Sequence, residues 1–159
     1  NHEIKKLLND YSCILKKLKA KDVVKTSNSP VGDYTEWLVS KLFPGAKPEP
    51  PSTKGYDLIF DGIRYQIKGR WLKPKQSTKQ LSIIRNLYAD PKGFDFLIGV
   101  LFNQDFSIQG AWKIPHECLT FSGNAKESTS QGGHIVHLKE PLISCKGVKE
   151  ITKCLQAIM

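Results

Sequence analysis

The sequence predicts an α/β domain with a mixed central sheet of about five strands flanked by helices. Two segments, over about residues 3–20 and 33–42, carry apolar residues at helical spacing. A hairpin follows at 55–68, and a nearly continuous apolar run at 94–102 indicates a buried central strand. The chain has 159 residues, of which 40% are hydrophobic, so one domain with a substantial core is expected.

The charge balance indicates the class of partner. Lys and Arg number 24 against 15 Asp and Glu, which gives a net charge of +9 and a pI of about 9.4. A basic balance of this size favours a polyanionic partner, nucleic acid before membrane, over charge that serves solubility alone. The sequence shows neither a signal peptide nor an apolar run of membrane-spanning length, so we expect a cytoplasmic protein.

The four cysteines are Cys13, Cys118, Cys145 and Cys154, and they form no Cys-x-x-Cys pair. We therefore expect reduced thiols, as in cytosolic proteins. His134 and His137 would point to opposite faces of a strand, which argues against a zinc site there.

Two amphipathic helices are expected ahead of the hairpin. The second runs from about Asp33 to Leu42 and is stopped by Pro44-Gly45. In the first, the apolar stripe is expected to pack against the domain and the flanking lysines to face solvent. That stripe consists of Ile4, Leu7, Leu8, Tyr11, Ile14, Leu15 and Leu18.

The hairpin at 55–68 is centred on Asp61-Gly62, which predicts a two-residue type I′ turn because both central residues need a positive φ. That turn places Asp57 opposite Gln66 on one face, at the same end as Lys68. It also pairs Phe60 with Ile63, Ile59 with Arg64, and Leu58 with Tyr65. The other face is apolar enough to be core and carries Leu58, Phe60, Ile63, Tyr65 and Ile67.

The grouping of Asp57, Gln66 and Lys68 has a chemical interpretation. A carboxylate and an amide oxygen are hard donors suited to Mg²⁺. A lysine beside them would stabilise charge on a phosphate, or help to orient or deprotonate a water. The stretch resembles the PD-(D/E)xK nuclease signature, with Asp57 at its first Asp and Gln66-Ile67-Lys68 at its second element.

Two positions depart from that signature. Tyr56 stands where the family has Pro, and Gln66 stands where Asp or Glu is usual, which removes a formal charge. The segment 32–39 looks like the helix that often supplies one more acidic residue in this superfamily, and Glu36 matches that position. The resemblance extends over about residues 31–119 and is most specific at the hairpin.

The resemblance implies a restriction-endonuclease-like fold and a metal-dependent endodeoxyribonuclease that hydrolyses DNA phosphodiester bonds. Its catalytic set would be Glu36, Asp57, Gln66 and Lys68. Mg²⁺, with Mn²⁺ as a substitute, would be held by Glu36, Asp57, Gln66 and the Ile67 carbonyl, while Lys68 would stabilise the transition state or position the water. A type II restriction endonuclease is the first expectation, acting as a homodimer or with a partner subunit.

The alternatives are a junction-resolving, repair or transposition nuclease of the same fold, a non-catalytic DNA-binding module, and a basic interaction domain without a nucleic-acid role. The basic stretch after the hairpin is the expected contact with a DNA backbone. Trp71 within it is interpreted as a structural anchor. With one lysine ahead of the hairpin, the expected DNA-binding residues are Lys54, Arg70, Lys73, Lys75 and Lys79.

We expect the whole chain, 1–159, to form a single nuclease domain. It divides into a helix and loop at 1–30, a nuclease core at 31–119, and a final strand and helix at 134–159. Smaller elements are expected beyond the hairpin. They are a short helix at 81–88, a return strand at 106–113, a helical turn at 114–119, a mobile loop at 122–133, a strand at 135–138 and a helical tail at 148–159.

Overall fold

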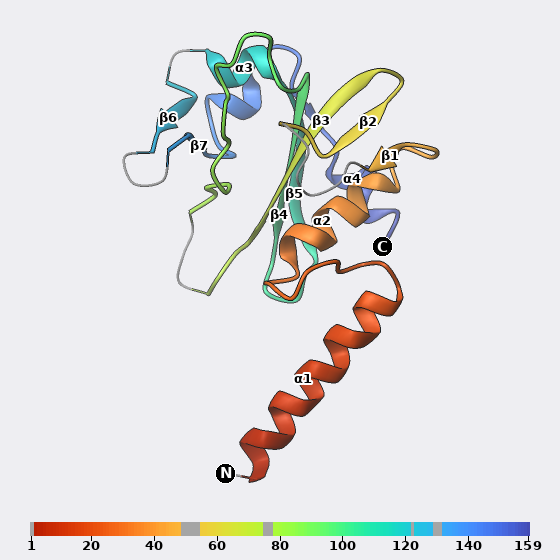
Figure 1. The fold of residues 1–159 in the computed structure, drawn as a ribbon. Helices are drawn as coiled ribbons and strands as arrows, with labels where there is room; N and C mark the ends of the chain where they lie inside the picture. Colours follow the sequence, from red (N-terminus) through yellow and green to blue (C-terminus); the bar gives the residue numbers. More distant parts are fainter. Residues whose placement is uncertain (1, 49–54, 75–77, 122, 129–131) are drawn as a thin grey trace.

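The computed structural model describes residues 2–48, 55–74, 78–121, 123–128 and 132–159. A mixed sheet of six strands runs through the molecule in the order β1-β2-β3-β4-β5-β8 (Figure 1). Its strands are β1 (Lys47–Pro48), β2 (Leu58–Phe60), β3 (Ile63–Trp71), β4 (Phe96–Phe102), β5 (Ile108–Pro115) and β8 (Lys149–Glu150). The predicted α/β class and the mixed sheet are confirmed, and β1 and β8 are only short additions at the two edges.

Helices and a small second sheet surround these strands. The helices are α1 (His2–Ala20), α2 (Val31–Ser40), α3 (His116–Thr120) and α4 (Thr152–Gln156), with a 3₁₀ turn at Leu142–Ser144. The second sheet pairs β6 (Ala125–Glu127) with β7 (His134–Val136). None of the helices in the described ranges has the length and apolar character needed to cross a bilayer.

Strand β4 is the centre of the fold because it is buried on both faces. It pairs in parallel with β3 and antiparallel with β5. Leu97 and Leu101 face one core, which the segments around α3 and β7 complete. Ile98, Val100 and Phe102 alternate with them and face a second core under α2 and α4. The continuous apolar run that predicted a central strand therefore serves two cores.

The close approach of α2 to β3 places one candidate residue of the site. Gly69 of β3 lies against the Thr35 side chain of α2, and a Cβ at this position would collide with Thr35 Oγ1. Thr35 is fully buried, and it is followed in α2 by Glu36. The absence of a side chain at Gly69 thus lets α2 lie directly on the sheet beside the hairpin.

The hairpin has the predicted register. Phe60 pairs with Ile63, Ile59 with Arg64, and Leu58 with Tyr65. Asp61 and Gly62 both have positive φ, at 50° and 75°, as a type I′ turn requires. Leu58, Tyr65 and Ile67 are buried in the core under α2, which confirms the apolar face of the hairpin.

Several of the smaller predicted elements are wrong. The segment 81–88 forms no helix; it runs beside β7 through bridges from Gln80 to His137 and from Ile84 to His134. Its apolar residues, spaced three apart, are buried by this contact rather than by a helical face. The strand expected at 135–138 is β7, which lies outside the main sheet, and β6 occupies part of the expected loop at 122–133.

The C-terminal tail is also divided differently from the prediction. Its helix is limited to α4, and the expected helical start at 148 is replaced by the edge strand β8. Thr152 explains the change, because its hydroxyl accepts a hydrogen bond from the Ala111 N–H of β5 at 3.0 Å. The tail is thereby tied to the sheet before it turns into a helix.

The prediction of four reduced thiols is wrong for two of them. Cys118 of α3 and Cys145 form a disulfide across a Cα–Cα distance of 6.1 Å, while Cys13 and Cys154 are free and exposed. The two bonded cysteines are 27 residues apart in sequence. The packing of the core around α3 brings them together, so no local sequence motif predicts the disulfide.

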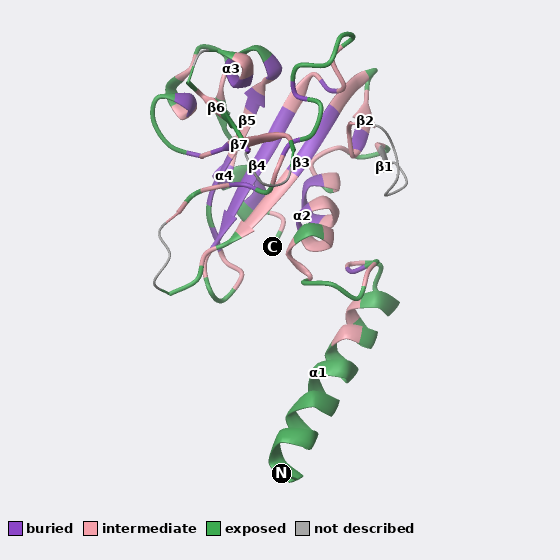
Figure 2. Ribbon diagram, turned by 60° about the vertical axis from the view of Figure 1, so that its left-hand side comes forward, coloured by how far each residue is buried: buried purple, intermediate pink, exposed green. Residues whose placement is uncertain are grey.

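Helix α1 forms over the predicted range, but its stripe does not pack as predicted. None of its residues is buried, and the helix extends away from the sheet as an almost wholly exposed rod (Figure 2). Ile4, Leu7, Leu8, Tyr11 and Ile14 are each more than half exposed.

Replacing Gly69 with alanine tests the close packing of α2. We expect Gly69→Ala to lower the free energy of unfolding by about 1–3 kcal/mol, because the new methyl group overpacks the contact with Thr35. Urea denaturation followed by circular dichroism measures the change. Gly32→Ala is the matched control. Gly32 belongs to α2, and a Cβ at this position would meet no atom within 4 Å. The control should be neutral or stabilise by about 0.5–1 kcal/mol, and equal losses in both variants would contradict the proposed packing.

Candidate active site

Asp57 lies at the open end of the hairpin, one residue before β2. Its N–H donates to the Tyr65 carbonyl at 2.8 Å, which continues the pairing of the two strands. Its Oδ2 accepts two hydrogen bonds of 2.6 Å, one from the Gln66 Nε2 and one from the Ile67 N–H. The predicted contact between Asp57 and Gln66 is therefore present, and the carboxylate is fixed by groups of β3.

Glu36 approaches from α2 and forms an ion pair with Lys25, whose Nζ lies 3.5 Å from Glu36 Oε2. Lys25 belongs to the loop between α1 and α2. Asp33 holds that loop, because its Oδ2 accepts the N–H groups of Lys25 and Thr26 at 2.8 Å and the Thr26 hydroxyl at 3.0 Å. Burial acts to raise the pKa of Asp33, but these hydrogen bonds and the Lys25 charge outweigh it and lower the pKa below the ordinary value.

Glu36, Asp57 and Lys25 share one hollow of about 200 Å³. Ile67 lines it from β3, and the other lining residues are Asp22, Trp37, Ser40 and Leu58. The hollow lies where α2, the α1–α2 loop and the end of the hairpin meet. The acidic residues Glu36, Asp57 and Asp22 thus line one small space together with Lys25.

The pKa of both carboxylates is raised above the ordinary range. Burial is the main cause for each of them. For Glu36 the negative charge of Asp57 adds to the effect, whereas Lys25 opposes it. For Asp57 the Ile67 N–H and the charges of Lys68 and Lys25 oppose it. Burial and mutual repulsion of this kind are what a bound cation would relieve.

The other two predicted catalytic residues lie outside that hollow. Gln66 and Lys68 alternate with Ile67 along β3 and pair with Leu97 and Gly99 of β4, on the face opposite α2. Gln66 is nearly buried and reaches Asp57 through its amide nitrogen. Lys68 is half-buried, and its charge acts to lower the pKa of Asp57 without a direct hydrogen bond in the described structure.

The predicted DNA-binding residues divide into two groups. Lys54 and Lys75 lie outside the described residues. Arg70 continues the row of Gln66 and Lys68 on β3, and its buried Nε has no hydrogen-bond partner within the described ranges. Lys73 and Lys79 are exposed.

Trp71 anchors the end of β3, as the sequence indicates. Its ring stacks on Phe106 at a centroid distance of 5.2 Å. Its Nε1–H donates to the Gln104 carbonyl at 3.2 Å. The ring is thus held by the β4–β5 turn.

The donor set at the hollow suits a hard cation better than a soft one. Across the described residues, no three His, Cys, Asp or Glu side chains are close enough together to hold a metal ion. The acidic residues that line the hollow are Glu36, Asp57 and Asp22, and Ile67 also lines it, while Gln66 lies outside it and binds Asp57. Mg²⁺ fits such a set, because it usually binds through one or two carboxylates and keeps several waters.

Lys25 and Asp33 are the residues of this region whose role the sequence analysis missed. Lys25 stands in a loop, 32 positions before Asp57, and nothing around it predicts a contact with an acidic residue. Asp33 was expected only as a first-turn helix residue. The hydrogen bonds that the N–H groups of Lys25 and Thr26 donate to Asp33 hold the loop against α2, and they depend on tertiary structure.

Comparisons with known proteins give a structural likeness and no match of sequence. No family model matches the sequence, and no curated protein matches it. Among solved structures the chain is similar to a bacterial homing endonuclease, I-Ssp6803I, at 18% identity and a TM-score of 0.44, over 73% of this chain and 78% of that one.

The raised pKa of Glu36 predicts how a neutral replacement affects stability. A carboxyl whose pKa is higher in the folded state resists ionisation there, so stability falls as pH rises from the ordinary Glu value of about 4.3 through the raised value. We expect Glu36→Gln to raise the Tm at neutral pH and to leave it unchanged below the ordinary value. Thermal denaturation at several pH values measures this. A lower Tm at neutral pH would mean that the ion pair with Lys25 outweighs burial and repulsion.

Proposed function

We propose that this chain is a metal-dependent endodeoxyribonuclease of the PD-(D/E)xK type, with a restriction-endonuclease-like fold. The observation that carries the proposal is the meeting of Glu36 and Asp57 at one hollow beside the hairpin end. Both carboxylates have a raised pKa, and both come from the elements on which the sequence signature places them. Carboxylates whose pKa is shifted by burial and by neighbouring charges cluster at functional sites.

Glu36 and Asp57 would hold Mg²⁺, with the Ile67 carbonyl as a further oxygen donor. A bound Mg²⁺ would lower the pKa of a water and offset charge on the scissile phosphate. Gln66 supports the site by fixing Asp57 Oδ2, and its amide oxygen is the weaker donor expected from the sequence. Mn²⁺, which accepts the same oxygen donors, would substitute.

Lys68 would stabilise negative charge on the phosphate or position the attacking water. Its position supports this role, because its charge already acts on the Asp57 carboxylate. Arg70 lies two residues further along the same face of β3 and is half-buried. Its positive charge and the exposed Lys73 and Lys79 would add contacts with the DNA backbone.

A type II restriction endonuclease is the role that we propose first. The loops of this domain or a partner would read the target. Cutting both strands with one site per chain favours a homodimer. A junction-resolving, repair or transposition nuclease would use the same site on a different DNA structure.

One observation favours a second candidate, a DNA-binding module without catalysis. Asp22, Glu36 and Asp57 all line the hollow, but within the described residues they form no cluster of three that could hold a metal ion, and the signature position of Gln66 lacks a negative charge. The pairing of Lys25 with Glu36 further reduces the negative charge at the hollow. Such a module would bind DNA in a salt-dependent way and leave it intact.

Plasmid cleavage separates the two candidates. We expect the protein to convert supercoiled plasmid to nicked or linear DNA with Mg²⁺ or Mn²⁺, and not with a chelator. Lys68→Ala should fold normally and cleave at least about 100-fold more slowly, the scale on which removal of one charge-stabilising group acts. Lys153→Ala, which removes an exposed lysine of α4, is the charge-matched control and should cleave normally.

The pattern of products decides between the roles. Discrete fragments indicate a sequence-specific enzyme, whereas cleavage of four-way junctions in preference to linear duplex indicates a resolvase. Cleavage by Lys68→Ala at the rate of the control would contradict the proposed catalytic role of Lys68. Plasmid that is shifted but never cut with either metal would favour the binding module.

Metal binding has a readout that does not depend on cleavage. We expect Mg²⁺ to raise the Tm of the protein, since a ligand at about 100 times its Kd stabilises a fold by about 2.7 kcal/mol. Asp57→Asn should lose most of that increment because it removes one of the two carboxylates. Differential scanning fluorimetry against Mg²⁺ concentration measures it, with Asp105→Asn as an exposed-carboxylate control away from the hollow. An equal increment in wild type and Asp57→Asn would exclude this site.

A further inference from the structure

The exposed stripe of α1 is a surface that the proposed activity does not use. Along this 19-residue helix no side chain is buried. The stripe runs from Ile4 to Leu18, about 21 Å at a rise of about 1.5 Å per residue. Monomeric proteins rarely leave a continuous apolar surface of this length in water, so the stripe indicates a missing partner.

The spacing of the stripe is that of a helix that pairs with another helix. Ile4, Leu7, Tyr11, Ile14 and Leu18 follow one another at alternating steps of three and four. These are the a and d positions of a heptad repeat, and they extend over about two and a half heptads. Leu8 and Leu15 widen the same face, and lysines flank it on both sides.

The stability of α1 also requires a partner. Most helices in proteins are held by packing of their apolar face, and a lone helix of this length is only marginally stable in water. Within the described residues α1 has no such packing. The helix joins the rest of the domain at its C-terminal end, near Ala20, and its N-terminal end points away from the sheet (Figure 1). A partner that covers the stripe would supply the missing contact.

We propose that the partner is a second copy of this chain, and that two α1 helices pair side by side in antiparallel orientation. The distribution of charge along the helix favours the antiparallel orientation. In residues 2–10, Lys5 and Lys6 balance Glu3 and Asp10, whereas residues 11–20 carry Lys16, Lys17 and Lys19 without an acidic residue. A parallel pair would place the two lysine-rich halves together, while an antiparallel pair places each beside a neutral half that contains acidic residues. Opposite helix dipoles then also lie side by side.

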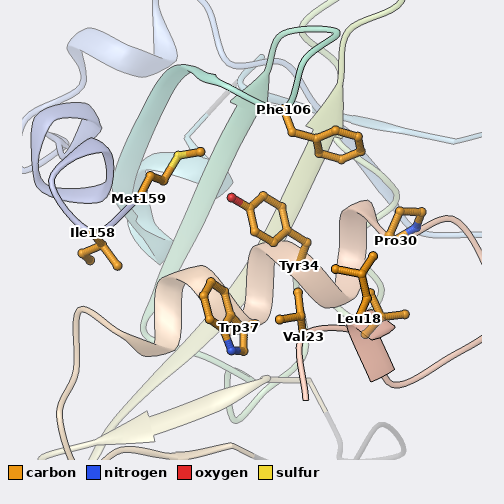
Figure 3. A pocket seen from close by; sticks show the side chains of 9 residues that line it. Leu18, Val23, Pro30, Tyr34, Trp37, Phe106, Ile158 and Met159 are labelled. Atoms are coloured by element: carbon orange, nitrogen blue, oxygen red, sulfur yellow. The ribbon is translucent and has the colours of Figure 1, made fainter. Parts of the chain in front are cut away.

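An apolar hollow at the base of α1 extends the surface. Leu18 lines it together with Val23, Tyr34, Trp37 and Phe106, and its volume is about 400 Å³ (Figure 3). The remaining lining residues are Val24, Pro30, Ile158 and Met159. In an antiparallel pair, the first turn of the partner helix lies beside the last turn of α1, so that the partner's Ile4 comes next to this hollow. The stripe and the hollow would then be covered together.

Oligomeric state tests this inference independently of nuclease activity. We expect the chain to run in light-scattering chromatography at twice its mass of 17.9 kDa. Leu7→Lys with Ile14→Lys should give a monomer, because both charges enter the paired face. Asn9→Lys with Cys13→Lys adds the same charge on the opposite face of α1 and should remain a dimer.

Near-ultraviolet circular dichroism confirms that the body of each variant is folded. A wild-type chain that is monomeric at every accessible concentration would overturn the proposal. So would equal behaviour of the two double variants, or a dimer that survives Leu7→Lys with Ile14→Lys. These outcomes leave the chemistry at Asp57 unaffected.

Thiol cross-linking tests the orientation. Glu3→Cys and Lys17→Cys would each be placed in a background of Cys13→Ser and Cys154→Ser, so that the only exposed thiol is the introduced one. After mixing the two proteins, we expect the mixed product, position 3 to position 17, to exceed the two products that join like positions. An excess of like products would establish a parallel pair and contradict the proposed orientation.

Discussion

The parallel pairing of β3 with β4 is the constraint on which the rest of the molecule depends. It runs over seven residues, from Tyr65 opposite Phe96 to Trp71 opposite Phe102. It turns a local hairpin into the middle of a sheet, and it requires both faces of β4 to be covered. Helix α2 covers one face and brings Glu36 to the hairpin end. Gln66, Lys68 and Arg70 lie in a row along β3, on the face of the sheet opposite α2.

The parts of the fold and of the candidate site that the sequence predicts are those with local causes. The turn chemistry of Asp61-Gly62 determines the register of the hairpin, and that register brings Asp57 to Gln66. The parts that it misses depend on contacts between distant segments. Lys25 reaches Glu36 only because Asp33 holds its loop, and Cys118 meets Cys145 only within a packed core.

Periodicity misleads where a buried surface is not made by a regular element. The spacing of Leu81, Ile84 and Leu87 is helical, yet these residues lie in an extended and turning segment beside β7. In α1 the same kind of signal predicts the helix correctly and its burial wrongly. A stripe shows that a helix has an apolar face, and it does not show which molecule covers that face.

The ammonium group of Lys25 acts as an internal counterion at the carboxylate pair. The folded chain therefore already carries a positive charge beside Glu36 before any cation arrives. A divalent cation that binds there would compete with this group, in the manner of ion exchange. Lys25 lies in the segment that joins α1 to α2, and its backbone N–H also donates a hydrogen bond to Asp33 of α2. Occupancy of the hollow would thus weaken the ion pair through which the segment after α1 contacts α2.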